Sequence, residues 1–354
     1  MRRHSIAVIP GDGIGKEVTP AAMMVLERAA RRHGFVLDAE TYPWNCDYYV
    51  ETGRMMPKDG LEKLRRHDAI FLGALGNPAL VPDHIALRES LLLWRQAFDL
   101  YINLRPVKVL PGIPGPLKER PGLSVDMVFI RENSEGEYAG IGGRLRQGGD
   151  DEVAIQTTVF TRKGVERVMR YAFEEARRRP RKLLACATKS NALNYTMVFW
   201  DEVCAEVAKE YPDVEVRKYH VDALAARMIS APETLDVVVT SNLFGDILTD
   251  LGGALQGSLG LPAGGNLDPE RRNPSLFEPV HGSAPDIAGR GIANPMAAVW
   301  AGSLMLDFLG ETEAAREVME ALEAVAAEGR VLTPDLGGSA TTEEVAKAIA
   351  DKLG

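Results

Sequence analysis

Short apolar runs alternate with amphipathic stretches along most of the chain. The runs are rich in Val, Ile and Leu, as expected of strands buried in a parallel sheet, and occupy residues 5–9, 69–72, 125–130, 182–187 and 235–240. Helical periodicity follows many of them, over residues 17–33, 164–178 and 197–209. This alternation predicts an α/β fold with a largely parallel sheet.

Two further segments carry local structural signals. Gly140–Asp151 is rich in glycine and charge, and residues 152–160 alternate like a strand, so together they predict a protruding hairpin at about 140–158. Near the end, Thr341-Thr-Glu-Glu344 has the spacing of a capping box, which predicts a last helix to about Leu353.

Size and composition narrow the class of protein. A chain of 354 residues favours two domains. A net charge of −9 argues against a general nucleic-acid or anionic-membrane binder. Three cysteines, Cys46, Cys186 and Cys204, have no paired spacing, which indicates a reducing compartment and no zinc site. The apolar stretch from Ala297 ends at Asp307, too short to span a membrane. We therefore expect a cytoplasmic protein.

The glycine-rich turn after the first predicted strand is not a dinucleotide-binding fingerprint. That fingerprint requires glycines at relative positions 0, 2 and 5, whereas Gly11, Gly13 and Gly15 fall at 0, 2 and 4. The spacing of a P-loop is absent as well. The turn is better interpreted as a tight strand-to-helix connection at the carboxyl edge of the sheet, where it borders a ligand crevice without gripping a phosphate.

Two carboxylates after the strand at 235–240 suggest a metal site. Asp246 and Asp250 are four residues apart on the helix predicted to follow Asn242, so both project from one face. Like charges at this spacing repel, and oxygen-only ligation suits a hard cation such as Mg²⁺ or Mn²⁺. The alternative for this pair alone is a solvated acidic face.

Other residues are candidates for substrate binding and proton transfer. Arg95, Arg105 and Arg131 carry the planar fork that binds carboxylates, although each alone fits a surface ion pair better than a substrate site. Tyr138 and Lys189 fit acid/base roles, because a cationic neighbourhood lowers the pKa of both groups. Their alternatives are a half-buried ring and a solvated lysine.

Taken together, the motifs resemble the β-decarboxylating dehydrogenases, which act on isopropylmalate, isocitrate, homoisocitrate, tartrate or D-malate. The resemblance covers nearly the whole chain, in order. It is carried by Ile9–Gly15, Asn103–Pro106, Arg131–Tyr138, Thr188–Lys189, Val221–Ala223, Asn242–Leu251 and Glu278–Pro295. The fold it implies has two α/β domains with a central cleft: residues 1–103 plus 258–354 would bind NAD, and residues 104–257 would form an inserted metal, substrate and dimerisation domain.

The resemblance also implies roles for the candidate residues. Asp246 and Asp250 would hold Mn²⁺ or Mg²⁺ with Asp222 of the other subunit, and Arg95, Arg105 and Arg131 would bind substrate carboxylates. Lys189, also across the interface, would promote removal of the hydroxyl proton, and Tyr138 would protonate the enol carbon. A homodimer with shared active sites, clasped by the hairpin, is therefore expected.

The cofactor expected from the resemblance is NAD, bound away from the glycine-rich turn. Asp286 matches the acidic residue that accepts hydrogen bonds from the adenosine ribose, and Ile287 stands where NADP enzymes usually carry tyrosine. K⁺ is a further expected cofactor, whose site the sequence does not locate. The cofactor-binding residues implied are Glu278, His281, Gly282, Ser283, Ala284, Asp286, Ile287 and Asn294.

The segment before Arg95 bears on the substrate. Leu91 and Leu92 match leucines that surround the isopropyl group in isopropylmalate enzymes, but Arg88 stands where those enzymes carry glutamate. Flanking segments resemble the tartrate/D-malate group more closely; they are Trp44–Tyr49, Thr52–Pro57, Val81–Ile85, Phe98–Pro106 and Arg179–Lys182. A tartrate or D-malate substrate is therefore predicted, with 3-isopropylmalate as the alternative. A silent regulatory subunit is disfavoured because the metal and acid/base residues are all present.

Overall fold

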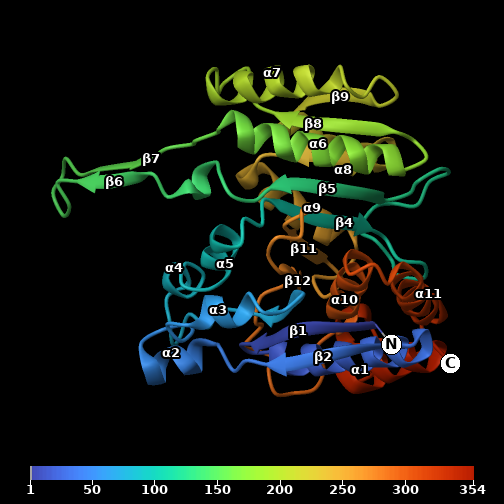
Figure 1. Ribbon diagram of the computed structural model, residues 1–354. Helices are drawn as coiled ribbons and strands as arrows, with labels where there is room; N and C mark the ends of the chain where they lie inside the picture. Colours follow the sequence, from blue (N-terminus) through green and yellow to red (C-terminus); the bar gives the residue numbers. More distant parts are fainter. Residues whose placement is uncertain (1) are drawn as a thin grey trace. The chain divides into compact units, whose positions relative to one another are not determined.

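The computed structural model describes residues 2–354, which form two compact units. The terminal unit comprises the chain up to Leu100, Lys108–Pro116 and Gly253–Gly354. The inserted unit comprises Tyr101–Val107 and Leu117–Gly252. Each has its own strands flanked by helices (Figure 1), so the predicted α/β class is confirmed.

The terminal unit is built on five neighbouring strands. β1 (Arg2–Gly11) pairs in parallel with β2 (Phe35–Thr41) and with β3 (Ala69–Ala74). β12 (Ser275–Pro279) lies parallel to β3, whereas β11 (Ala263–Leu267) is antiparallel to β12. This pair departs from the parallel pattern because only a short turn joins the two strands, and parallel strands need a longer crossover.

Helices pack on these strands. They are α1 (Gly15–His33), α2 (Cys46–Thr52), α3 (Gly60–Leu64), α4 (Asp83–Ala86), α5 (Leu91–Ala97), α10 (Met296–Phe308), α11 (Thr312–Glu328) and α12 (Thr342–Lys352). The apolar stretch noted from Ala297 is α10, a helix buried on almost every side. A Cβ at Gly302 would lie 2.5 Å from Leu26 Cδ1, so this glycine allows α10 to pack closely on α1.

The inserted unit contains a second group of strands, in the order β4-β5-β10-β8-β9. Their bounds are Ile102–Lys108, Asp126–Glu132, Val237–Thr240, Leu183–Thr188 and Glu215–His220. The pairs β5–β10, β10–β8 and β8–β9 are parallel. The helices of this unit are α6 (Arg162–Arg178), α7 (Thr196–Ala208), α8 (Val221–Ser230) and α9 (Asn242–Leu255), the last ending just beyond the unit.

A two-stranded hairpin projects from the inserted unit. β6 (Gly142–Leu145) and β7 (Val153–Gln156) are antiparallel, with every residue exposed. Figure 1 shows the hairpin extending away from β5 and α6. Four large apolar side chains on it are exposed: Ile141, Leu145, Val153 and Ile155. The hairpin therefore buries little of its surface against the rest of its own chain.

The predicted elements match the structure where periodicity was strong. The capping box is present, because the Thr341 side chain accepts from the Glu344 amide while Glu344 reaches back to Thr341. Weakly patterned elements were missed, among them β2, which is mostly exposed, and the short helices α2 to α5. The three cysteines are free and buried. No helix formed by residues 2–354 is long and apolar enough to cross a bilayer.

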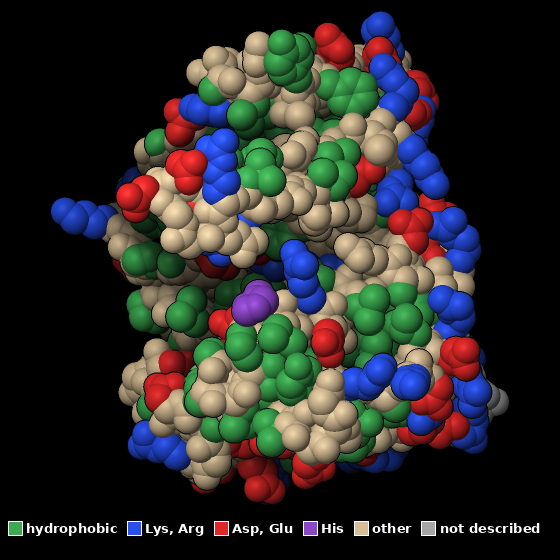
Figure 2. Space-filling view, turned by 90° about the vertical axis from the view of Figure 1, so that its left-hand side faces the viewer, with side chains coloured by type: hydrophobic (Ala, Val, Ile, Leu, Met, Phe, Trp, Pro, Cys, Tyr) green, Lys and Arg blue, Asp and Glu red, His purple; other side chains and the backbone are tan. Residues whose placement is uncertain are grey.

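On the face shown in Figure 2, acidic and basic side chains are interspersed.

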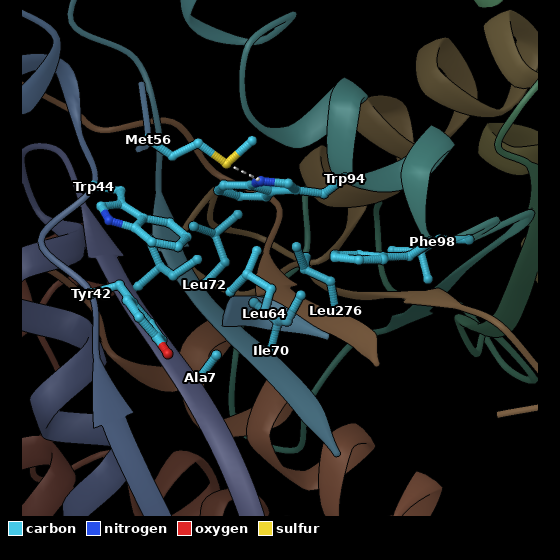
Figure 3. Close-up of a cluster of buried hydrophobic side chains, with 12 residues drawn as sticks. Ala7, Tyr42, Trp44, Met56, Leu64, Ile70, Leu72, Trp94, Phe98 and Leu276 are labelled. Carbon is cyan, nitrogen blue, oxygen red and sulfur yellow. Dashed lines mark hydrogen bonds between the residues drawn. The ribbon is translucent and has the colours of Figure 1, made fainter. Parts of the chain in front are cut away.

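One core cluster fixes α5 to the strands of the terminal unit. Trp94 of α5 and Phe98, which directly follows this helix, are both fully buried and pack in one cluster with Leu72 and Ile70 of β3 (Figure 3). The Trp94 indole N–H donates to the sulfur of Met56 at 3.3 Å. Because Trp94 is adjacent to Arg95, this packing also sets the position of the arginine.

We expect Trp94→Ala to destabilise the terminal unit by about 3–5 kcal/mol, because the change empties a cavity the size of an indole. Urea unfolding followed by circular dichroism measures the loss. Trp94→Phe, which keeps an aromatic ring, serves as the control and should cost less. A loss below about 1 kcal/mol for Trp94→Ala would mean that the cluster does not anchor α5.

Candidate active site

Arg131 is the central residue of the inserted unit's polar cluster. It lies near the carboxyl end of β5, is 1% exposed, and stands in register with Thr240 at the end of β10. Its Nε and Nη2 donate to Asn242 Oδ1 at 3.1 and 2.8 Å, and its Nη1 donates to Asp246 Oδ1 at 2.5 Å. Because parallel strands end at the same edge, the start of α9 lies directly against this guanidinium.

A glycine allows this close approach. A Cβ at Gly245 would lie 2.4 Å from the Thr240 hydroxyl and 2.6 Å from Arg131 Cγ. Any larger residue would therefore push the first turn of α9 away from β5. The glycine within the Asn242–Asp250 segment thus has a packing role that the sequence alone did not reveal.

Tyr138 joins the same cluster. Its hydroxyl donates to Asp246 Oδ2 at 2.8 Å, and the Arg131 guanidinium lies 5.5 Å from the centre of its ring. The ring stands on a short 3₁₀ turn, Glu137–Ala139, which follows Gly136 at a φ of +71°. The structure therefore brings Tyr138, Arg131 and Asp246 together, as a shared site requires.

Arg105 and Asp250 complete the charges in this cluster. Arg105 Nη1 donates to the Thr249 hydroxyl at 2.6 Å and lies 3.8 Å from Asp246 Oδ1. The pKa of Asp250 is raised, first by burial and then by the charge of Asp246, against the opposing effects of Arg105 and Arg131. The two carboxylates thus repel each other, and a bound cation would relieve that repulsion.

Lys189 and Asp222 form a separate pair in the inserted unit. Lys189 follows β8, Asp222 lies in the first turn of α8, and the ammonium donates to Asp222 Oδ1 at 2.6 Å. This hydrogen bond lowers the pKa of Asp222, whose side chain is 67% exposed. Among residues 2–354, no three His, Cys, Asp or Glu side chains form a metal-binding group, so one chain does not bring Asp222 to Asp246 and Asp250.

Arg95 belongs to a cluster in the terminal unit. The buried guanidinium donates through Nε to Asn266 Oδ1 at 2.9 Å, and its Nη2 lies 3.7 Å from Glu278 Oε1. Asn266 also donates to Glu278 at 2.8 Å. Sequence reasoning missed Asn266, because its contact with Arg95 joins segments 171 positions apart and its full burial within the strand Ala263–Leu267 is seen only in the structure.

The leucines predicted to surround the substrate differ in their packing. Leu91 packs against the core cluster that contains Trp94, whereas Leu92 is partly buried and lies outside that cluster. Arg88 is exposed, and no hydrogen bond or ion pair of its side chain occurs within residues 2–354. The segment therefore combines an exposed cation with two partly exposed leucines, one of which also packs on the core.

The glycine-rich turn is occupied by protein. Ile14 N donates to Ser283 O at 2.9 Å, and a Cβ at Gly13, whose φ is +50°, would lie 2.0 Å from that oxygen. The buried Asp12 accepts from the amides of Cys46 and Gly76, both at 2.9 Å. These contacts support the prediction that the turn does not grip a phosphate, and they identify Asp12 as a structural residue that sequence reasoning missed.

The predicted cofactor segment follows β12 and combines anchored and available groups. Ser283 is buried and donates to Gly76 O, and Asn294 bonds to Asp335 at 3.0 Å. His281 bonds through Nδ1 to Gly282 O at 3.0 Å, while its Nε2 is buried without a partner among the described residues. Burial lowers the pKa of His281, so its imidazole is neutral at neutral pH.

Four other predicted cofactor residues differ in exposure. Asp286 and Gly282 are exposed, Ala284 and Ile287 are half-buried, and Ala284 has a φ of +41°. No hydrogen bond to the Asp286 carboxylate occurs within residues 2–354. An exposed carboxylate and an orphaned imidazole nitrogen on one loop are suited to receive a hydroxyl-bearing ligand.

A family model and the sequences of known proteins both match nearly the whole chain. The family model for isocitrate/isopropylmalate dehydrogenase matches residues 5–349. D-malate dehydrogenase (decarboxylating) of Escherichia coli strain K12 is 53% identical over 355 residues, covering 99% of this chain and 98% of that protein. Tartrate dehydrogenase/decarboxylase of Pseudomonas putida is 50% identical over 362 residues, covering 100% and 99%.

A solved structure gives the same answer. The crystal structure of isocitrate dehydrogenase from Methylococcus capsulatus superposes with a TM-score of 0.86 at 39% identity, covering 99% of both chains. The resemblance predicted from the motifs is thereby confirmed. The chain belongs to the isocitrate/isopropylmalate dehydrogenase family.

Proposed function

We propose that this protein catalyses the NAD- and divalent-metal-dependent oxidation, with decarboxylation, of a 2-hydroxy dicarboxylic acid. The substrate is D-malate, converted to pyruvate and CO₂, or tartrate. The observation that carries the proposal is the cluster in which Asp246 faces Tyr138, Arg131 and Arg105 beside Asp250. Relatives whose names specify D-malate and tartrate dehydrogenases, at 50–53% identity over nearly full length, support it.

The metal would be Mn²⁺ or Mg²⁺, held by Asp246 and Asp250 with Asp222 of the partner subunit. The raised pKa of Asp250 supports this choice, because a divalent cation would offset the repulsion from Asp246 that helps to raise it. Bound there, the cation would supply a Lewis acid, and bound NAD⁺ would supply a hydride acceptor.

Substrate carboxylates would bind to arginines. Arg131 and Arg105 already face Asp246, so they would orient an anion beside the metal. Arg95 would be a third carboxylate-binding guanidinium, held in place by Asn266 and Glu278. Because each arginine is at least partly buried, its charge is screened less by water than that of a surface residue.

Proton transfer would use Lys189 and Tyr138. Lys189 of the partner subunit would accept the proton from the C2 hydroxyl as the alcohol becomes a ketone. Loss of CO₂ from the neighbouring carbon leaves an enol, and the Tyr138 hydroxyl would protonate its carbon. The hydrogen bond from Tyr138 to Asp246 supports this role, because it directs the phenol into the cluster of charges.

NAD would bind along residues 278–294. The unbonded carboxylate of Asp286 suits the two ribose hydroxyls of adenosine, and the same charge would repel the 2′-phosphate of NADP. The orphaned Nε2 of His281 supports a ligand at this loop, since a buried polar atom without a partner is costly. Half-buried Ile287 offers an apolar neighbour.

A homodimer would complete each site. The single chain leaves Asp222 apart from Asp246 and Asp250, which supports a site shared between two subunits. The exposed apolar residues of the hairpin β6–β7 support its role as a clasp at about 140–158. The inserted domain at 104–257, a cytoplasmic location and K⁺ activation remain parts of this proposal.

3-Isopropylmalate is the alternative substrate. Leu91 and Leu92 favour it, but Leu91 packs in part against the core cluster, and the exposed cation Arg88 opposes an isopropyl group. A cation at this position suits a substrate with a polar group at C3, such as tartrate.

The function is tested by following NADH absorbance with Mn²⁺ and K⁺ in the presence of D-malate, L-tartrate, meso-tartrate, 3-isopropylmalate or isocitrate. We expect the highest kcat/KM with D-malate or a tartrate isomer. Preference for 3-isopropylmalate would instead support the alternative. No activity on any of these acids would contradict the proposal and favour a regulatory subunit.

Tyr138→Phe is expected to lower kcat by about 10²–10⁴-fold, the usual contribution of a general acid. Because protonation would become the slow step, the isotope effect from 2-deuterated D-malate on kcat should shrink. The control is a Mn²⁺ titration of the same variant. A shifted Mn²⁺ affinity with an unchanged isotope effect would mean that Tyr138 only holds Asp246 in place.

A further inference from the structure

A basic pocket in the terminal unit contains none of the candidate catalytic, substrate, metal or cofactor residues. It has a volume of about 440 Å³. Its walls come from the start of β1, the segment between α3 and β3, the turn between β11 and β12, and the end of α10. A volume of this size is within the range of small-molecule sites, about 300–1,000 Å³.

The walls carry a concentration of positive charge in a chain whose net charge is −9. Five arginines line the pocket, with Asp68 as its single lining acid: they are Arg3, Arg65, Arg66, Arg271 and Arg272. Arg3 pairs with the exposed Asp38 at 3.2 Å. Within residues 2–354, Arg65, Arg66 and Arg271 have no carboxylate oxygen at ion-pair distance, so three guanidinium charges in the pocket are uncompensated.

The turn between β11 and β12 places two of these arginines at the pocket, where Arg271 donates to the Phe308 carbonyl oxygen and lies 4.7 Å from the centre of its ring. Asp268, fully buried, accepts hydrogen bonds from the backbone amides of Arg272 at 2.9 Å and of Asn273 at 3.0 Å. Arg271 adopts a φ of +57°, which is unfavourable for a residue with a side chain. Such strain persists where surrounding contacts enforce it, and it is common at ligand-binding sites.

His67 forms a rigid neutral part of the wall. Its ring bonds to the Ser5 and Tyr42 hydroxyls, each at 2.9 Å, and burial lowers its pKa despite the nearby acids Glu40, Asp68 and Asp38. The positive charge of the pocket therefore comes from arginines, whose planar forks suit phosphate and carboxylate groups.

Two of the pocket arginines also contact the end of α5. Arg65 donates to the carbonyl oxygen of Ala97 at 3.5 Å and lies 5.6 Å from the centre of the Phe98 ring. Arg272 bonds to Asp99 at 3.3 Å. Arg95 lies on α5. An anion that binds to Arg65 and Arg272 would therefore alter the contacts that hold the helix carrying Arg95.

We propose that this pocket binds a small organic polyanion, bearing a phosphate chain or several carboxylates, and that binding stabilises the end of α5. Orthophosphate alone would fill little of the cavity, so a larger ligand with several charged groups fits better. The probes are inorganic tripolyphosphate, citrate and orthophosphate, added to protein from which metal ions have been removed on a chelating resin, so that no metal-bound anion occupies the candidate active site. Tripolyphosphate lacks adenosine and so does not mimic NAD.

Isothermal titration calorimetry of the full chain measures the affinity for each probe. We expect either tripolyphosphate or citrate to bind at least tenfold more tightly than orthophosphate, and the tighter of the two identifies the class of ligand. Arg66→Gln/Arg271→Asn should weaken that binding at least tenfold; asparagine is chosen because it tolerates a positive φ. The matched control, Arg316→Gln/Arg330→Gln, removes the same charge from arginines that lie outside the pocket and are paired with glutamates. This control variant should bind the same probe with the affinity of the wild type.

Hydrogen exchange of the peptide covering residues 91–100 tests the link to α5. Bound polyanion should slow exchange in the wild type and in the control, but not in the pocket variant. Absence of binding by all three probes would overturn the site, and so would equal weakening by the pocket and control variants. Binding without a change in exchange at 91–100 would overturn the link to α5. None of these outcomes depends on the enzymatic activity proposed above.

Discussion

The buried guanidinium of Arg131 is the interaction on which the polar cluster of the inserted unit depends. A charge that is 1% exposed must be neutralised and hydrogen-bonded, and Asn242 and Asp246 do both. Breaking such a pair typically costs about 3–5 kcal/mol, because one buried charge is left without its partner. The same bonds fix the first turn of α9, so the positions of Tyr138, Arg105 and Asp250 all follow from them.

The consequence for chemistry is a site that combines opposite charges at short range. The carboxylates of Asp246 and Asp250 repel each other on one face of α9, while Arg105 and Arg131 both approach Asp246. A divalent cation would neutralise the two carboxylates, and a dicarboxylate would pair with the two arginines, so the two ligands together suit the site better than either alone. This complementarity explains why a hydroxy acid chelated to a metal is the ligand that the cluster suits, and why the family membership and the geometry lead to the same proposal.

Local sequence patterns predicted the features that depend on local spacing. Asp246 and Asp250 share a helical face because of their separation, and Thr341 caps its helix through a residue three positions away. Contacts between distant segments could not be predicted in this way. Asn266 meets Arg95 across 171 positions, Asp12 meets Gly76, and the arginines of the basic pocket come from three separate segments. Each depends on how strands are ordered in the sheet, which no local periodicity encodes.

The central claim is that Asp222 of one subunit completes the metal site of the other. Its most direct test mixes two variants, Asp222→Asn and Asp246→Asn, each expected to be inactive as a homodimer. After dissociation and reassociation, a mixed dimer contains one site with both substitutions and one intact site. The account predicts recovery of about a quarter of wild-type activity, because half of the dimers are mixed and each has one working site. No recovery, with mixed dimers verified by mass spectrometry, would contradict it.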